Sequence, residues 1–429
     1  MTSPVDITTR SPRPARRCRG GHRTTATVAV TVGALTLTAF AGVGSASAAP
    51  APESTTAVSA LSHGAKGRPA PGSGKLVKAT SLPPEARPHG GPGQVVEYTS
   101  TGADGRKVLV SGMIFAPAGT PPKGGWPVIS LAHGTVGSAD QCAPSRTDAA
   151  TFAHDPEIRR WLDSGVAVVA TDYEGLGTAG DHPYLHARSA AYGTIDIVRA
   201  ARQADVGVSR RWVAMGHSQG GHAAISTAVH AARYSSYAQG AWGDPRGLDF
   251  RGAVATAPPT SMSRLVADRS TSPTIERKVR TALYPLVTEG LRAVDDDYDF
   301  THLFTDRAAE LVPTARTKCL PELVAQTVQS GLNDDTVWKQ RPETVPDLLN
   351  ALRKHVDTPV ARLDQPLFIG QGAKDEIVQA HVTADYAKAL RKAGSKVTYR
   401  EYATANHGSV VDAAAAESTA WIKQRLGVR

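Results

Sequence analysis

The sequence predicts an α/β fold in which helices cover both faces of a mostly parallel sheet. Short apolar runs rich in β-branched residues alternate with stretches of helical periodicity, as in parallel strands joined by helices. The alternation breaks between about residues 258 and 362, where helical periodicity continues without a clear strand. A G-x-S-x-G motif at residues 216–220 directly follows one predicted strand. We therefore expect a sheet core, a helical insertion and a reactive serine at a strand-to-helix turn.

The first 48 residues have the pattern of a secretory signal peptide. Six arginines precede an apolar run from about residue 24 to 43, and Ala46-Ser47-Ala48 then fits a cleavage site. A membrane anchor is the alternative, but the run is short, rich in Ala and Thr, and ends in Gly and Ser. We therefore expect a secreted, extracellular protein.

The charge of the mature chain argues against a nucleic-acid partner. Removal of residues 1–48 deletes six arginines and Asp6, so the formal net charge falls from +9 to +4. The sequence contains no basic stripe, no interleaved aromatic residues and no recognised nucleic-acid-binding module. We expect a monomer without a nucleic-acid partner.

Residues 49–90 are rich in Pro, Gly, Ser and Ala and lack apolar periodicity, which predicts a flexible leader. The core is expected at 91–257 and 363–429. Its predicted strands are 94–100, 107–115, 126–132, 165–171, 212–215, 250–256, 366–370 and 396–402. Its predicted helices lie near 158–162, 184–203, 379–392 and 410–425.

The helical insertion at 258–362 is expected to form a cap or lid. Helical periodicity is clear at 275–294, 308–312, 320–328 and 345–352. In an open α/β sheet, such an insertion between core strands lies over their carboxyl ends, where active sites are found. The alternative is an ordinary second domain remote from the site.

The motif around Ser218 has the features of a nucleophile elbow. The apolar strand Trp212–Met215 leads into the turn, and an Ala-rich helical stretch follows. A serine raised above a sheet on a strained turn needs small neighbours, and Gly216 and Gly220 meet that need. The turn also places the hydroxyl of Ser218 at a helix N-terminus, whose dipole favours developing negative charge.

An acid and a base follow Ser218 in the order typical of a hydrolase elbow. Asp375 lies on the loop after strand 366–370, and we prefer it to Glu376, which leads into the next apolar residues. His407 lies on the loop after the last strand. Its imidazole would take the proton of Ser218, and Asp375 would stabilise the imidazolium.

Two backbone donors are expected to stabilise an oxyanion. The first is the N–H of Gln219, the residue after the nucleophile. The second is less defined, and the general candidate is Thr135 in the His133-Gly134-Thr135 loop after strand 126–132. His222 is expected to have a structural role, and His217 is expected to point away from the site.

Two cysteines remain in the mature chain, because Cys18 belongs to the signal peptide. Cys142 and Cys319 are expected to be bridged in an oxidising compartment. Such a bond would connect the loop after the third core strand to the helical insertion.

Two further motifs make the resemblance specific. Residues 172–177 spell D-Y-E-G-L-G after a strand, and His182-Pro183-Tyr184 follows. With the elbow, the H-G loop and the Ser-Asp-His order, residues 90–425 resemble the α/β-hydrolase superfamily and, within it, secretory lipases of the LIP family. The resemblance implies that Asp172, rather than Thr135, is the second oxyanion-hole donor. It also implies an acyl-ester or lipid substrate and transient contact of the cap with a lipid interface.

Two other patterns do not support a cofactor or a metal. Gly175 to Gly180 spell G-x-G-x-x-G, but no helix opens at once and Asp196 lies inside a helical pattern. Asp295, Asp297 and Asp299 alternate as in a calcium loop, but Phe300 stands where Gly is needed. We expect neither group.

The sequence therefore predicts a secreted serine carboxylic-ester hydrolase, a lipase or esterase that cleaves acyl esters such as triacylglycerols through an acyl-enzyme. A peptidase or acyltransferase on the same scaffold is the alternative. A non-catalytic binding protein on this fold is a third hypothesis, which the complete Ser-Asp-His set disfavours.

Overall fold

The computed structural model describes residues 70, 72–87, 90–147, 155–237, 247–268 and 273–428. The signal peptide predicted at 1–48 and most of the leader predicted at 49–90 lie outside these residues. The description below therefore concerns the core and the insertion.

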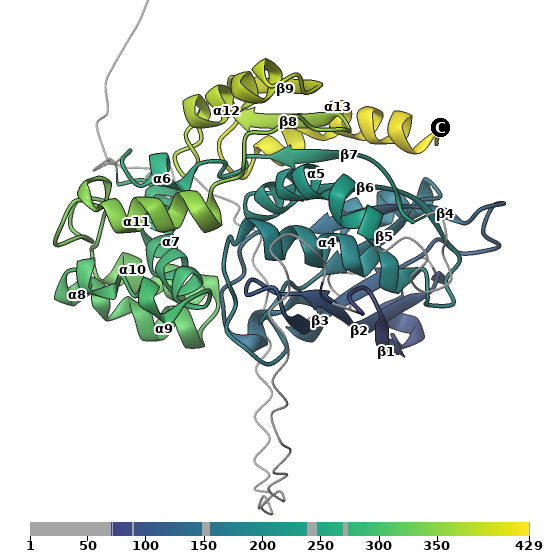
Figure 1. Ribbon diagram of the computed structural model, residues 1–429, viewed down its shortest axis with the longest axis horizontal. Helices are drawn as coiled ribbons and strands as arrows, with labels where there is room; N and C mark the ends of the chain where they lie inside the picture. The colour runs from purple at the N-terminus through teal and green to yellow at the C-terminus, as the bar shows by residue number, and fades with distance from the viewer. Residues whose placement is uncertain are drawn as a thin grey trace, which may run out of the picture. The chain divides into compact units, whose positions relative to one another are not determined.

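One sheet of nine strands forms the centre of the described part of the chain (Figure 1). The strands are β1 (Leu76–Ser81), β2 (Gly93–Thr101), β3 (Lys107–Phe115), β4 (Trp126–Ala132), β5 (Ala167–Thr171), β6 (Val208–His217), β7 (Asp249–Thr256), β8 (Leu367–Gly372) and β9 (Val397–Tyr402). Their order is β1-β2-β3-β5-β4-β6-β7-β8-β9. Pairing is antiparallel from β1 through β3 to β5 and parallel from β5 to β9. The carboxyl ends of the parallel strands therefore meet at one edge.

Regular structure begins before residue 90, where the sequence predicts that the leader ends. β1 lies inside residues 49–90 and pairs antiparallel with β2. Five of its six residues are exposed. An edge strand of this kind has no alternation of buried and exposed residues, so periodicity does not reveal it. The eight strands that the sequence did predict are all present.

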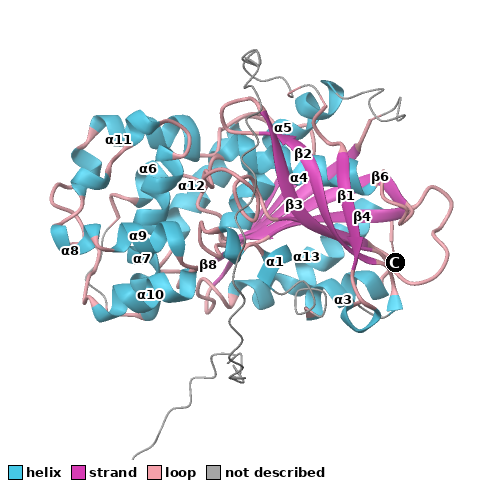
Figure 2. Ribbon diagram, turned by 90° about the horizontal axis from the view of Figure 1, so that it is seen from below, coloured by secondary structure: helices cyan, strands magenta, loops and turns pink. Residues whose placement is uncertain are grey.

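Helices cover both faces of the sheet (Figure 2). In the core they are α1 (Pro144–Thr147), α3 (Pro156–Asp163), α4 (Ala187–Ala201), α5 (Gln219–Tyr237), α12 (Ala380–Lys392) and α13 (Val410–Leu426), with short 3-10 turns at Pro84–Ala86 and Asp140–Cys142. Adjacent β4 residues face opposite sides, since Val128 packs in the cluster with α4, α5 and α12, and Ile129 packs in the one with α3 and α13. None of the described helices is long and apolar enough to span a membrane.

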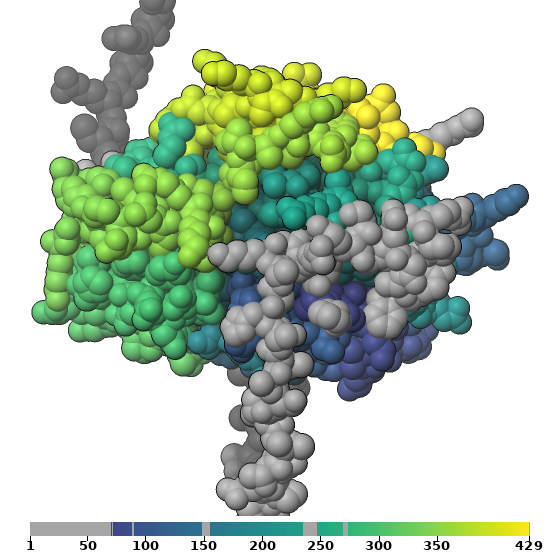
Figure 3. Space-filling view, viewed as in Figure 1, coloured from purple at the N-terminus to yellow at the C-terminus, as the bar shows by residue number. Residues whose placement is uncertain are grey.

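The described residues 258–268 and 273–362, between β7 and β8, form what we call the helical insert. Its helices are α6 (Met262–Leu265), α7 (Ile275–Arg292), α8 (Asp306–Ala309), α9 (Leu311–Thr317), α10 (Leu320–Gln329), α11 (Pro346–Ala351) and the π-helix η8 (Leu352–Val356), with 3-10 turns at Asp296–Tyr298, Thr301–Leu303 and Pro342–Thr344. These helices bury a separate apolar cluster, which Tyr184 and Val378 of the core join. Figure 3 shows the green residues of the insert beside the yellow C-terminal residues.

Covalent and polar contacts attach the insert to the core. Cys142, after β4, and Cys319, before α10, are joined by a disulfide bond with their Cα atoms 5.4 Å apart. Beside it, the N–H of Leu320 donates to the carbonyl of Val136 at 2.8 Å. On α5, Nε2 of His222 lies 2.6 Å from the carbonyl of Val356 at the end of η8. The insert is therefore fixed to two separate parts of the core.

Candidate active site

The turn between β6 and α5 gives Ser218 a left-handed backbone conformation, with φ of 56°. Such a conformation is strained for a residue with a side chain and is often found at functional sites. A Cβ atom added to Gly216 would lie 2.4 Å from the backbone of Gly220. A Cβ atom on Gly220 would lie 1.9 Å from the carbonyl oxygen of Ala132. Both glycines are therefore required by the close approach of backbone to backbone, as the sequence predicts.

The structure brings the side chains of Ser218, His407 and Asp375 together. Nε2 of His407 lies 2.9 Å from Oγ of Ser218, and Nδ1 lies 2.8 Å from Oδ2 of Asp375. Since a carboxylate only accepts, Nδ1–H donates to Asp375, and Nε2 is left to accept the serine hydroxyl. In this tautomer the imidazole can receive the serine proton.

Asp375 is buried, and its orientation is set by three further donors. Oδ1 accepts the backbone N–H groups of Ile377 at 2.9 Å and Val378 at 2.8 Å, and Oδ2 accepts Nε2 of Gln371 at 3.0 Å. The carboxylate of Glu376 turns away and accepts the hydroxyl of Thr274. The geometry therefore separates Asp375 from the other acid that the sequence offered.

Two neighbouring histidines are neutral for the same physical reason. Burial, followed by the proximity of His407, lowers the pKa of His217 to about 3. Its ring lies 4.8 Å from that of His407, so it packs against the base, whereas the sequence suggested that it points away. Burial also lowers the pKa of His222 to about 4. Its Nε2–H donates to Val356, in agreement with the expected structural role.

Gln219, the first residue of α5, is oriented by a chain of contacts that the sequence did not reveal. Its Nε2 donates to Nε2 of His182 at 3.2 Å, and Nδ1 of His182 donates to the carbonyl of Glu174 at 2.7 Å. Burial lowers the pKa of His182 to about 4, so the ring is neutral and can accept. His182 of the H-P-Y motif therefore holds the side chain of Gln219, the residue after the nucleophile. The motif is the feature of the sequence that could have indicated this contact.

Asp172 does not have a donor directed at Ser218, contrary to what the resemblance implies. Its backbone N–H donates to the carbonyl of Ser111 at 2.9 Å. Its carboxylate is fully buried and accepts Oγ of Ser111 at 2.6 Å, the N–H of Ser145 at 3.0 Å and the hydroxyl of Ser145. The backbone N–H and the carboxylate of Asp172 are therefore both occupied inside the fold. Asp172 is not the second oxyanion donor that the resemblance implies.

The D-Y-E-G-L-G motif supports the H-G loop instead. Tyr173, next to Asp172, donates its hydroxyl to the carbonyl of His133 at 2.9 Å. In that loop, Oγ1 of Thr135 lies 2.7 Å from the hydroxyl of Tyr184. Within the described residues, no protein acceptor takes the backbone N–H of Thr135. Thr135 thus has the free donor that Asp172 lacks.

A narrow pocket opens beside Ser218 between the core and the insert. Ser218 is one of the residues that line it. Its apolar walls come from Leu185, Ile377 and Val378 of the core and Met262, Leu283 and Val287 of the insert. An apolar pocket next to a nucleophile is suited to an alkyl or acyl chain.

Comparisons with known proteins agree with this architecture. The family described as LIP, secretory lipase, matches residues 144–429. No curated protein matches the chain. Among solved structures, Candida antarctica lipase A is similar with a TM-score of 0.66 and 20% identity, over 83% of this chain and 82% of that one. The rice cell wall degrading esterase LipA from Xanthomonas oryzae has a TM-score of 0.63 and 18% identity, over 83% of this chain and 97% of that one. At these identities, the two structures establish the α/β-hydrolase fold alone.

Proposed function

The chain belongs to the secretory lipase family and is a carboxylic-ester hydrolase; we propose that it is a secreted enzyme whose triad is Ser218, His407 and Asp375. Family membership implies ester or lipid substrates. The observation that carries the proposed triad is the pair of contacts at 2.9 and 2.8 Å that join Ser218 through His407 to Asp375. Nucleophile, base and orienting acid are thus within hydrogen-bond distance in the required order.

In the proposed acylation step, Oγ of Ser218 attacks the ester carbonyl carbon as its proton moves to Nε2 of His407. Asp375 stabilises the imidazolium and remains ionised. The tetrahedral intermediate then expels the alcohol, which takes the proton from His407. An acyl group is left on Ser218. Water, activated by the same imidazole, attacks this acyl-enzyme and releases the carboxylic acid and free Ser218.

We assign the two oxyanion donors to the backbone N–H groups of Gln219 and Thr135. Gln219 is at the N-terminus of α5, where the first N–H groups have no intrahelical acceptor. Thr135 replaces Asp172 because the N–H of Asp172 already donates to Ser111. A donor of this kind typically contributes about 3–4 kcal/mol to transition-state stabilisation.

The pocket beside Ser218 supports acyl esters, triacylglycerols among them, as the substrate class. Residues 258–362 would act as the cap, since the insert supplies one wall of the pocket. The core would then comprise 91–257 and 363–429, together with β1. A polar head would remain at the mouth, while the acyl chain contacts apolar side chains.

Secretion is supported by the basic, apolar and small-residue segments within residues 1–48. The disulfide bond between Cys142 and Cys319 is also consistent with folding in an oxidising compartment.

The test is turnover of a p-nitrophenyl ester by the wild-type protein and by Ser218→Ala. We expect turnover to fall by about 10⁴-fold or more, since nucleophile removal in serine hydrolases has effects of that size. An organophosphonate should label the wild type and leave Ser218→Ala unlabelled, with the melting temperature unchanged. Wild-type turnover by the variant would refute the triad.

Two substrate panels sharpen the assignment. Cleavage of amides without cleavage of esters would favour the peptidase alternative. A series from short p-nitrophenyl esters to emulsified triglycerides would separate esterase from lipase activity.

A further inference from the structure

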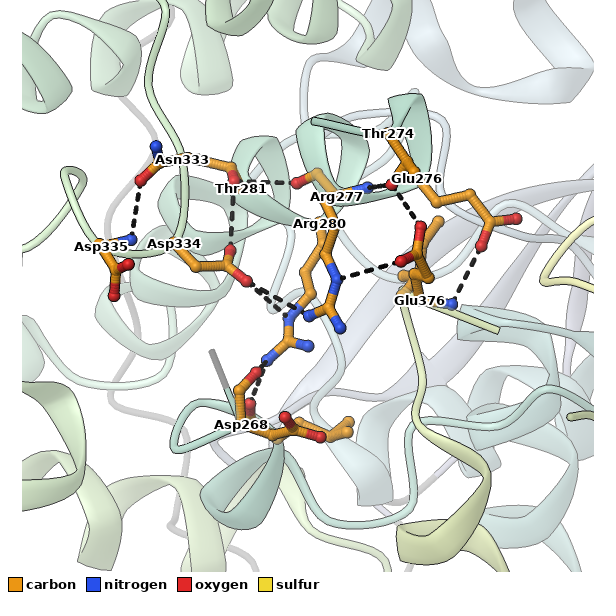
Figure 4. Close-up of polar contacts among 12 residues, drawn as sticks. Asp268, Thr274, Glu276, Arg277, Arg280, Thr281, Asn333, Asp334, Asp335 and Glu376 are labelled. Atoms are coloured by element: carbon orange, nitrogen blue, oxygen red, sulfur yellow. Dashed lines mark hydrogen bonds and ion pairs between the residues drawn. The ribbon is translucent and has the colours of Figure 1, made fainter. Parts of the chain in front are cut away.

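Glu276, in the first turn of α7, lies between the two loops that carry the proposed acid and base. Its Oε1 accepts the backbone N–H of His407 at 3.1 Å, and its Oε2 accepts the backbone N–H of Glu376 at 3.0 Å. Figure 4 shows the contact between Glu276 and Glu376. One carboxylate of the insert therefore contacts the base itself and the neighbour of Asp375.

We infer that Glu276 is a positioning residue that sets the separation of the His407 and Asp375 loops. This inference rests on the proposed function, because it assigns a role relative to the triad. The insert would then position His407 in addition to lining the pocket. Through Glu276, the placement of α7 determines how His407 is presented to Ser218.

The geometry of the contact explains why it can fix a distance. A carboxylate is a rigid planar group, and each oxygen of Glu276 is assigned to a different loop. Bonds from N–H groups to an ionised acceptor are shorter and about twice as strong as neutral ones. Elsewhere the two loops meet through the side-chain bond from His407 to Asp375 and through the N–H of Lys374, which donates to the carbonyl of Ala405 at 2.9 Å. Neither contact includes the backbone N–H of His407, so Glu276 restrains the base at a separate point.

The start of α7 is itself fixed on both sides. Towards the core, the hydroxyl of Thr274 donates to the carboxylate of Glu376, and Nε of Arg277 lies 3.9 Å from Oε1 of Glu376. Towards the rest of the insert, Nη1 of Arg277 lies 3.4 Å from Oδ2 of the buried Asp334. Figure 4 shows Arg277 between these two acids. The position of Glu276 thus depends on the internal contacts of the insert.

The electrostatics of the site also favour a specific role. Burial raises the pKa of Glu276, the charge of Asp375 acts in the same direction, and the N–H donors of Glu376 and His407 lower it. A second carboxylate near Asp375 is repelled by it, as like charges are. The two backbone donors offset that repulsion. The hydrogen bonds from Glu376 and His407 therefore hold the Glu276 carboxylate at a position where burial and the charge of Asp375 disfavour its ionised form.

The test compares Glu276→Ala and Glu276→Gln with Glu322→Ala. Glu322 is also in the first turn of an insert helix, α10, and is exposed, so it controls for loss of a favourable helix-dipole interaction. With p-nitrophenyl butyrate, kcat of Glu276→Ala should fall by about 10- to 100-fold, the effect of a small misplacement of a catalytic group. KM should stay within about twofold, since the pocket lining is unchanged. Phosphonate labelling of Ser218 should slow by a similar factor.

Glu276→Gln retains one carbonyl oxygen and should recover part of the lost kcat. If Glu276→Ala does not fold, Glu276→Gln decides, and wild-type kcat in that variant overturns the inference. Equal kcat in Glu276→Ala and Glu322→Ala also overturns it, as does a raised KM at unchanged kcat. Failure of the proposed function is distinguishable, because it appears as retained turnover in Ser218→Ala.

Discussion

The turn that carries Ser218 and the insert that lines its pocket are built from different kinds of contact. At the turn, backbone lies directly against backbone, and Gly220 approaches Ala132 too closely for any side chain. The N–H of Ser218 also donates to the carbonyl of Thr256 on the neighbouring strand β7. The insert meets the core backbone to backbone where Gly290 lies against Tyr184 and Gly137 against Cys319. Its other contacts with the core use side chains, including one disulfide bond, the His222 ring and the Glu276 carboxylate.

Because of this difference, the two regions should respond differently to substitution. Backbone packing in a sheet allows little adjustment, so the nucleophile has one position. Side-chain contacts can be exchanged one at a time without loss of the sheet. We therefore expect substitution of a closely packed glycine at the turn to lower stability and turnover together, and substitution of single side chains at the insert to alter stability or rate separately.

The largest effect is expected for Gly220→Ala. The added Cβ would lie 1.9 Å from the carbonyl oxygen of Ala132, which cannot move without displacing β4. We expect a loss of about 3 kcal/mol or more in the free energy of unfolding, at the upper end for overpacking. Ester turnover should fall by about 100-fold through displacement of Ser218. Urea unfolding and p-nitrophenyl ester hydrolysis measure the two effects.

Gly408→Ala is the matched control. Gly408 follows the proposed base directly, but a Cβ atom there meets nothing within 4 Å. Stability and turnover should both stay near wild-type values. If the two variants behaved alike, close backbone packing at Gly220 would not be the cause of the losses expected for Gly220→Ala.

The features at the turn are those that the sequence reveals, because they depend on local pattern. Gly216, Ser218 and Gly220 are contiguous, and the strand before them is apolar. Asp375 and His407 could be placed because both follow core strands, and parallel strands bring such loops to one edge. The core helices and the helical nature of the insert also follow from apolar periodicity.

The parts that the sequence did not reveal depend on contacts between distant segments. Glu276 is far from His407 in the chain, and a glutamate in a first helical turn is usually explained by the helix dipole. Asp172 was misassigned because a motif gives the residue and not the direction of its N–H. β1 escaped detection because its residues are exposed.

An effect on stability with little change in turnover is expected from removal of the disulfide bond. Cys142→Ser with Cys319→Ser should lower the free energy of unfolding by about 3–5 kcal/mol, since the bond closes a long loop. The bond spans 177 residues. The neighbouring hydrogen bond from Leu320 to Val136 should keep the insert near its place, so turnover at 25 °C should change little.

Thermal unfolding with and without a reductant measures this contribution. The wild type should lose stability on reduction to the level of the double variant, and the double variant should not respond. A double variant that is as stable as the wild type would mean that the polar contacts alone attach the insert.

The smallest effect is expected where the two regions meet at Thr135. Its hydroxyl contacts Tyr184, which packs in the apolar cluster of the insert, whereas its backbone N–H is the proposed oxyanion donor. Thr135→Val removes the hydroxyl and preserves the N–H, so kcat should fall less than about fivefold, the loss of one hydrogen bond of about 1 kcal/mol. Tyr184→Phe removes the partner hydroxyl and should have a similar effect. A decrease of about 100-fold in Thr135→Val alone would instead place the hydroxyl in the oxyanion hole, since removal of one such donor costs that much. The chemistry would then depend on a side chain that the insert orients, and the difference between the two regions would not hold at that position.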